Sequence, residues 1–288
     1  MIKESELIIN EDGSAFHLHL KPEQLADRVV MCGDPQRVSA IAEYFDRREC
    51  EVSSREFHTI TGSYKGKRIT ALSHGIGGDN LDIVVNELDA LANIDFRTRT
   101  VKDGFRQLTL VRIGTSGGLQ PYTPVGSYVA AEQSIGLDGV IYFYKDSARV
   151  RNQTLEKELI EQLDWRIEGI KPYVVAAAPS LIEQICKDDI IRGLTIAANG
   201  FYGPQGRELR LPLADPTLNA RIEAFESSDR RRITNYEMES SALAALAALM
   251  GHRAMTVCCI IAGRVDSTMN TDYKASLPRL IETVLERI

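Results

Sequence analysis

An arginine inside an apolar segment is the first feature of this sequence that suggests chemistry. Residues 108–119 read LTLVRIGTSGGL, so Arg112 follows β-prone residues and precedes a predicted turn of Gly, Thr and Ser. A buried guanidinium needs a negative or hydrogen-bonding partner, because its desolvation costs several kcal/mol. From these residues alone two partners are open, an internal Asp or Glu or a bound anion. The predicted turn favours the anion, because backbone N–H groups of residues 114–117 could form an anion-binding nest.

A second junction carries similar groups. CGDPQR, residues 32–37, places Gly33 where the backbone can approach a ligand and Arg37 in the first turn of a predicted helix. A helix N-terminus favours an anion, although an ordinary capped helix with a solvated arginine is the alternative. Taken together, the two junctions predict one phosphate site. GIGGDN, residues 75–80, lacks the order of a dinucleotide fingerprint, so no nucleotide cofactor is expected.

The segments that must position these groups alternate between strand and helix patterns. Asp34 suits a helix N-cap and Pro35 the first helical position. A Lys-Gly turn at 65–66 predicts a hairpin. Apolar strands are predicted at 28–32, 108–113, 125–132, 172–178, 193–198 and 253–263, and helices at 79–94, 154–163, 180–187, 216–226, 238–250 and 273–287. The charged stretch 96–107 is expected to be irregular and exposed, and the whole pattern predicts an α/β sandwich with a mixed sheet.

Composition narrows the class of protein. The chain has 34 Lys and Arg against 40 Asp and Glu, a net charge of −6, which argues against a nucleic-acid partner. Its 5 cysteines have no metal-ligand spacing and are expected to be reduced core thiols. No apolar run approaches the roughly 20 residues of a membrane span, so no membrane partner is expected. A cytoplasmic location is the expectation.

Six short segments in order carry a resemblance to a known family. GDPQRV, SREF, HGIGG, RIGTSGG, FYGPQGR and NYEMES resemble the nucleoside phosphorylase-I family, specifically its uridine phosphorylase branch. The resemblance implies a single domain over residues 1–288, folded as a three-layer α/β/α sandwich with a central mixed sheet. It also implies a pentosyltransferase of pyrimidine salvage, which splits uridine, and in some cases deoxyuridine, into uracil and the pentose 1-phosphate. Inorganic phosphate would be the co-substrate, without a cofactor.

The resemblance also implies a role for individual residues. Phosphate would be bound by Gly33, Arg37, Arg112 and Thr115, with Arg55 of a neighbouring subunit. Ribose would be bound by Met238 and Glu239, with His17 of a neighbouring subunit. A homo-oligomer with shared active sites, a dimer or a hexamer of dimers, follows from these two assignments. Without the resemblance, His17 or His19 would be a surface strand histidine and NYEMES a helix start with acidic residues near the dipole.

The FYGPQGR segment would bind the base. The residues implied for this role are Phe201, Gln205, Arg207 and, after a later strand, Arg264. An aromatic ring can stack on uracil, an amide can pair with a carbonyl and N3–H, and a guanidinium can donate to a base oxygen. Read as bare sequence, the segment is a Gly/Pro loop with an exposed aromatic residue.

Departures from the family pattern keep some alternatives open. FYGPQ stands here where the family has FYPGQ, and some relatives hold a monovalent cation with residues matching Glu56, Ile76 and a serine. Asn80 replaces that serine, so a metal site is not predicted. Purine relatives place an aspartate near residue 264, and Asp266 lies too far along to match it. A purine or methylthioadenosine phosphorylase or nucleosidase, or a non-catalytic nucleoside-binding protein, remains the alternative.

Overall fold

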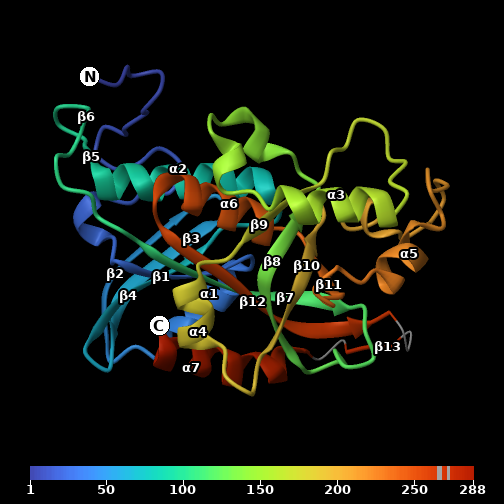
Figure 1. Cartoon of the computed structure of the whole chain (residues 1–288). Coiled ribbons are helices and arrows are strands. Elements are labelled where there is room, and N and C mark those ends of the chain that lie inside the picture. Colours follow the sequence, from blue (N-terminus) through green and yellow to red (C-terminus); the bar gives the residue numbers. More distant parts are fainter. Residues whose placement is uncertain (265–267, 271–272) are drawn as a thin grey trace.

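One mixed sheet forms the centre of the computed structural model, which describes residues 1–264, 268–270 and 273–288 (Figure 1). Its strands are β1 (Arg28–Cys32), β2 (Arg47–Ser54), β3 (Phe57–Tyr64), β4 (Lys67–Ser73), β7 (Thr109–Gly118), β8 (Tyr128–Gly136), β9 (Tyr173–Ala176), β10 (Ile191–Ala197), β11 (Ile233–Glu237), β12 (Arg253–Gly263) and β13 (Thr268–Met269). They follow the order β13-β12-β8-β10-β11-β7-β1-β4-β3-β2, with β9 paired to β8. Parallel pairs such as β1–β7 and antiparallel pairs such as β3–β4 confirm a mixed sheet.

The sheet curls until two distant strands meet. β12 pairs with β8 on one side and runs parallel to β7 on the other, from Arg253↔Thr109 to Gly263↔Gly118. β11 joins β7 at Gly117 and Gly118, so β12, β8, β10, β11 and β7 form a closed ring of paired strands. Closure gives each of these five strands a paired neighbour on both sides over part of its length.

Helices cover both faces of the sheet, which confirms the predicted sandwich class. The helices are α1 (Pro35–Ala42), α2 (Gly78–Asn93), α3 (Gln153–Gln162), α4 (Pro179–Ile185), α5 (Leu218–Ala224), α6 (Ser240–Met250) and α7 (Leu277–Arg287). α1, α4 and α7 pack on one face around Ile41, Leu181 and Leu280, and α2 with α6 packs on the other around Leu88 and Leu246 (Figure 1). A third cluster places α3 and α5 beside β10. None of the helices that the structure describes is both long and apolar enough to cross a bilayer.

Local sequence signals account for several boundaries. The Asp34 side chain accepts a hydrogen bond from the Gln36 N–H (2.9 Å), and Pro35 begins α1 as predicted. Lys65 and Gly66 have positive φ values of 46° and 76°, which is the conformation of a two-residue hairpin turn between β3 and β4. Helix α7 begins later than predicted, because residues 273–276 form a 3-10 turn before Leu277.

Other sequence expectations were wrong. Residues 114–118 are not a turn, because β7 continues through them as a paired strand. β2 and β11 were not predicted; both are rich in polar residues, and β11 is buried along its whole length. The stretch 96–107 is largely exposed but not wholly irregular, since β5 (Ile94–Asp95) pairs with β6 (Thr100–Val101). Cys50 lies half-buried on β2 and is not a core thiol, whereas the other four free cysteines are buried.

Candidate active site

A cavity of about 1200 Å³ opens where the two ends of the curled sheet approach one another. Ten residues to which the sequence assigned a substrate role line it: Gly33, Arg37, Arg112, Thr115, Phe201, Gln205, Arg207, Met238, Glu239 and Arg264. They come from the turn after β1, from α1 and β7, from the segments that follow β10 and β11, and from the residue after β12. Segments far apart in the chain therefore meet at one hollow.

The floor of the cavity is a stretch of β7 with one unpaired edge. On that edge β1 pairs with β7 as far as Arg112, and β11 pairs with it from Gly117 onward. Between them the Ile113 carbonyl accepts a hydrogen bond from Arg37 Nη1 (3.1 Å). Because strand residues alternate in direction with a period of two, the Thr115 N–H points to the same open side as Ile113. The strand thus provides the backbone donor that the sequence had assigned to a turn.

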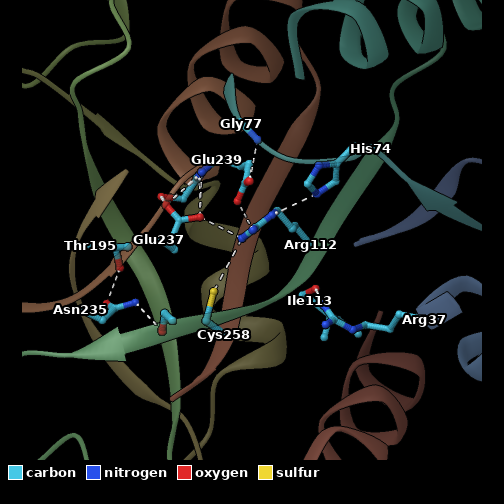
Figure 2. Close-up of polar contacts among 12 residues, drawn as sticks. Arg37, His74, Gly77, Arg112, Ile113, Thr195, Asn235, Glu237, Glu239 and Cys258 are labelled. Carbon is cyan, nitrogen blue, oxygen red and sulfur yellow. Dashed lines mark hydrogen bonds and ion pairs between the residues drawn. The ribbon is translucent and has the colours of Figure 1, made fainter. Parts of the chain in front are cut away.

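Arg112 is buried within this floor, with 4% of its surface exposed. Its Nη1 donates to Glu237 Oε2 (2.9 Å), its Nη2 to Glu239 Oε2, and its Nε to His74 Nε2 (3.1 Å) (Figure 2). Arg112 is therefore paired with internal acids, which was one of the two partners that the sequence allowed. It nevertheless lines the cavity. Gly114 makes room for it, because a Cβ there would lie 2.6 Å from Arg112 Nη1.

Electrostatics in this cluster follow from burial and charge. Burial raises the pKa of Glu239, and the adjacent Arg112 opposes that shift. Burial opposes the charge of Arg112, but Glu239 and Glu237 together raise its pKa, so it stays a cation. Burial lowers the pKa of His74 well below its usual range, and Arg112 adds to the effect, so this imidazole is neutral.

Glu237 and Glu239 divide their tasks at the start of α6. Glu237 accepts from the Ser240 hydroxyl (2.6 Å) and from the Ser240 and Glu239 N–H groups (both 3.0 Å). This is the helix-start role that NYEMES suggested as bare sequence. Glu239 accepts from the Gly77 N–H (2.8 Å) and from Arg112, and it lines the cavity. Both carboxylates therefore pair with Arg112, but Glu237 is also tied to the start of α6, whereas Glu239 is also tied to Gly77.

The opposite end of the cavity is built on a loop. The Arg207 guanidinium lies 3.9 Å from the Phe201 ring centroid, and its Nη1 donates to Gln205 Oε1 (2.5 Å). Arg264 lies over the Tyr236 ring at 4.9 Å and donates to the Gln205 carbonyl. Burial lowers the pKa of Arg207, and the second cation, Arg264, lowers it further. The inverted Gly-Pro order forms a 3-10 turn over Gly203–Gln205.

Two predicted residues lie outside this cavity. The Glu87 carboxylate lies 2.6 Å from His17 Nδ1 and accepts hydrogen bonds from the backbone N–H groups of His17 (3.0 Å) and Leu18 (2.9 Å). Arg55 is exposed at the turn between β2 and β3, and its guanidinium lies 5.9 Å from the Phe16 ring centroid. The structure therefore brings His17 and Arg55 close to each other through Phe16, and neither lines the cavity of its own chain.

Three residues in these networks were missed by sequence reasoning. His74 and Glu237 lie within HGIGG and NYEMES, so their motifs were found without their roles. Glu87 lies on a helix of ordinary pattern, which gave no signal. Glu56, Ile76 and Asn80, considered for a cation, line the same cavity as Arg37. Asp266 falls outside the described residues.

The fold and the cavity define a class of protein. The family described as the phosphorylase superfamily matches residues 27–286, so the chain belongs to that superfamily. A uridine phosphorylase of Haemophilus influenzae is 30% identical over 251 residues, which are 86% of each chain. A DeoD-type purine nucleoside phosphorylase of Clostridium perfringens is 27% identical over 275 residues, 94% of this chain and 97% of its own. A solved Trypanosoma brucei nucleoside phosphorylase, described as showing uridine phosphorylase activity, has a TM-score of 0.89 at 29% identity, with 98% of each chain covered.

Proposed function

We propose that this protein is a uridine phosphorylase, which converts uridine and phosphate reversibly into uracil and ribose 1-phosphate. Deoxyuridine is a second candidate substrate. The observation that carries the proposal is the meeting, in one cavity, of a floor bearing Arg37 and Arg112 and a loop bearing Gln205 and Arg207. Both uridine and purine nucleoside phosphorylases are among the relatives, so the choice between them depends on the loop.

Phosphate would bind over the open edge of β7. Arg37 lines the cavity, and no ion pair to a carboxylate occupies it among the described residues. The Thr115 N–H and the Gly33 backbone add donors on either side of it. A guanidinium and backbone N–H groups are suited to a phosphate dianion. Arg112 supplies positive charge from below.

Ribose would lie between this floor and the loop. Met238 would pack on the sugar, and Glu239 would accept hydrogen bonds from its hydroxyls, since a carboxylate can accept from two donors. Phosphate then attacks C1′ while the bond from C1′ to the base nitrogen breaks, and the electron pair leaves with the base. No enzyme carboxylate has to act as a nucleophile. The protein positions the reactants and stabilises the moving charge.

The base end would receive that charge. Arg207 holds Gln205 Oε1, which leaves the Gln205 amide nitrogen as the donor toward a pyrimidine carbonyl. Arg207 and Arg264 are both cations near this end, so they would stabilise a uracil anion. Phe201, with 49% of its surface exposed, offers a ring on which the base can stack. Cations and an amide suit the leaving uracil better than a purine that must be protonated at N7.

A homo-oligomer, as a dimer or a hexamer of dimers, would complete the site. His17 and Arg55 lie outside the cavity of their own chain but adjacent to each other, which supports their entering the cavity of a neighbouring copy. We also propose that the chain is a single domain and acts in the cytoplasm, without a cofactor.

A single assay tests the activity. Uridine and inosine are each incubated with and without phosphate, and the change in absorbance is followed. We expect turnover of uridine that requires phosphate. Inosine turnover instead would identify the purine branch, phosphate independence would identify a nucleosidase, and binding without turnover would identify a nucleoside-binding protein.

A mixing experiment tests the shared site. R55A and E239A proteins should each be inactive, because each lacks one group in every site. If Arg55 serves the neighbouring cavity, random exchange of subunits should restore about a quarter of wild-type activity, since half the dimers are hybrids with one intact site. Absence of recovery after proven exchange would place Arg55 in the cavity of its own chain.

A further inference from the structure

His74 contacts Arg112 in the floor of the cavity, and the family resemblance assigns it no role. It follows the last residue of β4, its side chain is fully buried, and its N–H donates to the Cys32 carbonyl (2.9 Å). Its Nε2 accepts from Arg112 Nε at 3.1 Å, so the ring proton must lie on Nδ1 (Figure 2). That Nδ1 is buried and makes no hydrogen bond to any residue that the structure describes.

The position is one where an acid would be expected. Arg112 has five N–H donors, and the contacts with His74, Glu237, Glu239 and Cys258 use four of them. Two of these partners are carboxylates, so the cluster already carries more negative than positive charge. A third carboxylate would add repulsion against an incoming phosphate dianion at close range. A neutral acceptor orients the guanidinium without that repulsion.

We propose that His74 is a positioning residue of the phosphate site, whose neutral imidazole fixes the Arg112 guanidinium while keeping the floor able to accept a dianion. The proposal rests on the proposed function, because it takes the floor as the phosphate site. His74 reaches the ligand through Arg112 and does not itself contact it. The lowered pKa of His74, caused by burial and by Arg112, keeps the ring neutral at the pH of the reaction.

Two substitutions of equal shape separate charge from packing. H74Q and H74E have nearly the same shape, and each can place an acceptor oxygen near the position of Nε2; they differ in charge and in the amide donor that only Gln carries. Phosphate binding is measured by calorimetry without nucleoside, and the KM values for phosphate and uridine are measured separately. We expect H74Q to weaken phosphate binding a few-fold and H74E to weaken it about tenfold more. The KM for uridine should change less than the KM for phosphate in both.

His252 provides the matched control. It is also buried, accepts from the Leu108 N–H (3.1 Å), lies 3.1 Å from Asp89 and stacks on Phe105. None of these three partners lines the cavity, whereas Arg112, the partner of His74, does. H252Q should lower the melting temperature and leave both KM values unchanged. Equal phosphate affinities of H74Q and H74E, or equal shifts in the two KM values, would overturn the role of His74.

The wild-type protein gives a second test that does not depend on folding of a variant. Nitrogen NMR of the His74 ring at pH 6 should show the neutral Nδ1–H tautomer both before and after addition of phosphate. Protonation of the ring on phosphate binding would overturn the proposal. If the wild-type protein does not turn over uridine at all, the proposed function fails. If it does, and H74Q and H74E bind phosphate with equal affinity, only the positioning role of His74 fails.

Discussion

The two ends of the cavity are built in different ways. At the floor, Arg112 and Glu239 are almost wholly buried, and they are joined by hydrogen bonds to residues of three separate segments. At the base end, Phe201 and Tyr202 are exposed, and the contacts join a loop to itself, to Asn219 of α5 and to Arg264 after β12. Strands hold the first region, and a loop with one 3-10 turn holds the second.

This difference suggests a division between chemistry and specificity. Arg112, Glu237 and Glu239 are each held by several other groups, so their positions are fixed before a ligand arrives. The base loop has fewer constraints, and a loop can change sequence without disturbing the sheet. Relatives named for uridine and for purine nucleosides both match this chain, as expected if the floor is shared and the loop differs.

Removal of Arg112 should have the largest effect and should act on stability as well as activity. R112A leaves Glu237 and Glu239 buried without their cation, so the free energy of unfolding should fall by about 3–5 kcal/mol. Uridine phosphorolysis should fall at least ~10³-fold, since the floor loses its central charge. Urea unfolding and steady-state kinetics measure the two effects. A stable but inactive R112A protein would show that the floor is not held together by this ion cluster.

Glu239 should matter for activity more than for stability. E239Q keeps the shape of the side chain and leaves Arg112 paired with Glu237. Loss of the charged acceptor for the ribose hydroxyls should lower kcat/KM for uridine about 10²-fold. The rate of phosphorolysis with each variant checks this. An E239Q enzyme as active as wild type would remove Glu239 from the ribose site.

The same carboxylate should set the acid side of the pH profile. Burial raises the pKa of Glu239 above the usual carboxyl range. Activity needs the ionised form, so kcat/KM should fall as the pH drops through this raised pKa, at a higher pH than for an ordinary glutamate. The pH dependence of kcat/KM for uridine measures it. An acid limb at the usual carboxyl pKa would contradict the assignment.

Removal of the Arg207 side chain should lower activity on uridine and leave the fold intact. R207A removes the donor to Gln205 and the cation over Phe201, so kcat/KM for uridine should fall about 10–100-fold. Its unfolding free energy should stay within about 0.5 kcal/mol of wild type, because the loop is at the surface. R210A, on the same loop but outside this cavity, is the control and should leave kcat/KM unchanged. Equal losses in both variants would mean that the loop is merely sensitive to any change.

Thiol reactivity should give the smallest effect and should report on the rigidity of the floor. Burial raises the pKa of Cys258, which contacts Arg112, to about 12, and burial raises that of Cys32 to the same value. In the native protein a thiol reagent should therefore modify Cys50 and not Cys258, and C50S should abolish the fast reaction. Mass spectrometry of the labelled protein identifies the site. Rapid labelling of Cys258 would show that the floor opens readily.

Local signals explain why most of the elements could be predicted. The Asp34-Pro35 pair begins α1, the Lys65-Gly66 turn joins β3 to β4, and the apolar periodicity of α2 gives its buried face. The sequence did not predict β11, because neighbouring strands supply the partners that allow this polar strand to be buried. Asn235 donates to the Ser116 hydroxyl (3.0 Å) and accepts from the Thr195 hydroxyl (2.8 Å) (Figure 2). A pattern read along one segment does not contain such partners.

The sequence by itself determined which residues are equipped for an anion, a sugar and a base, because residue types and motif order are properties of the chain. Tertiary structure alone decided that Arg112 lies between two carboxylates and a neutral histidine, and that an open strand edge provides the donors assigned to a turn. It also decided that His17 and Arg55 lie outside their own cavity. The physical reason is that hydrogen bonding and desolvation depend on which distant segments meet, and the curled sheet sets those meetings.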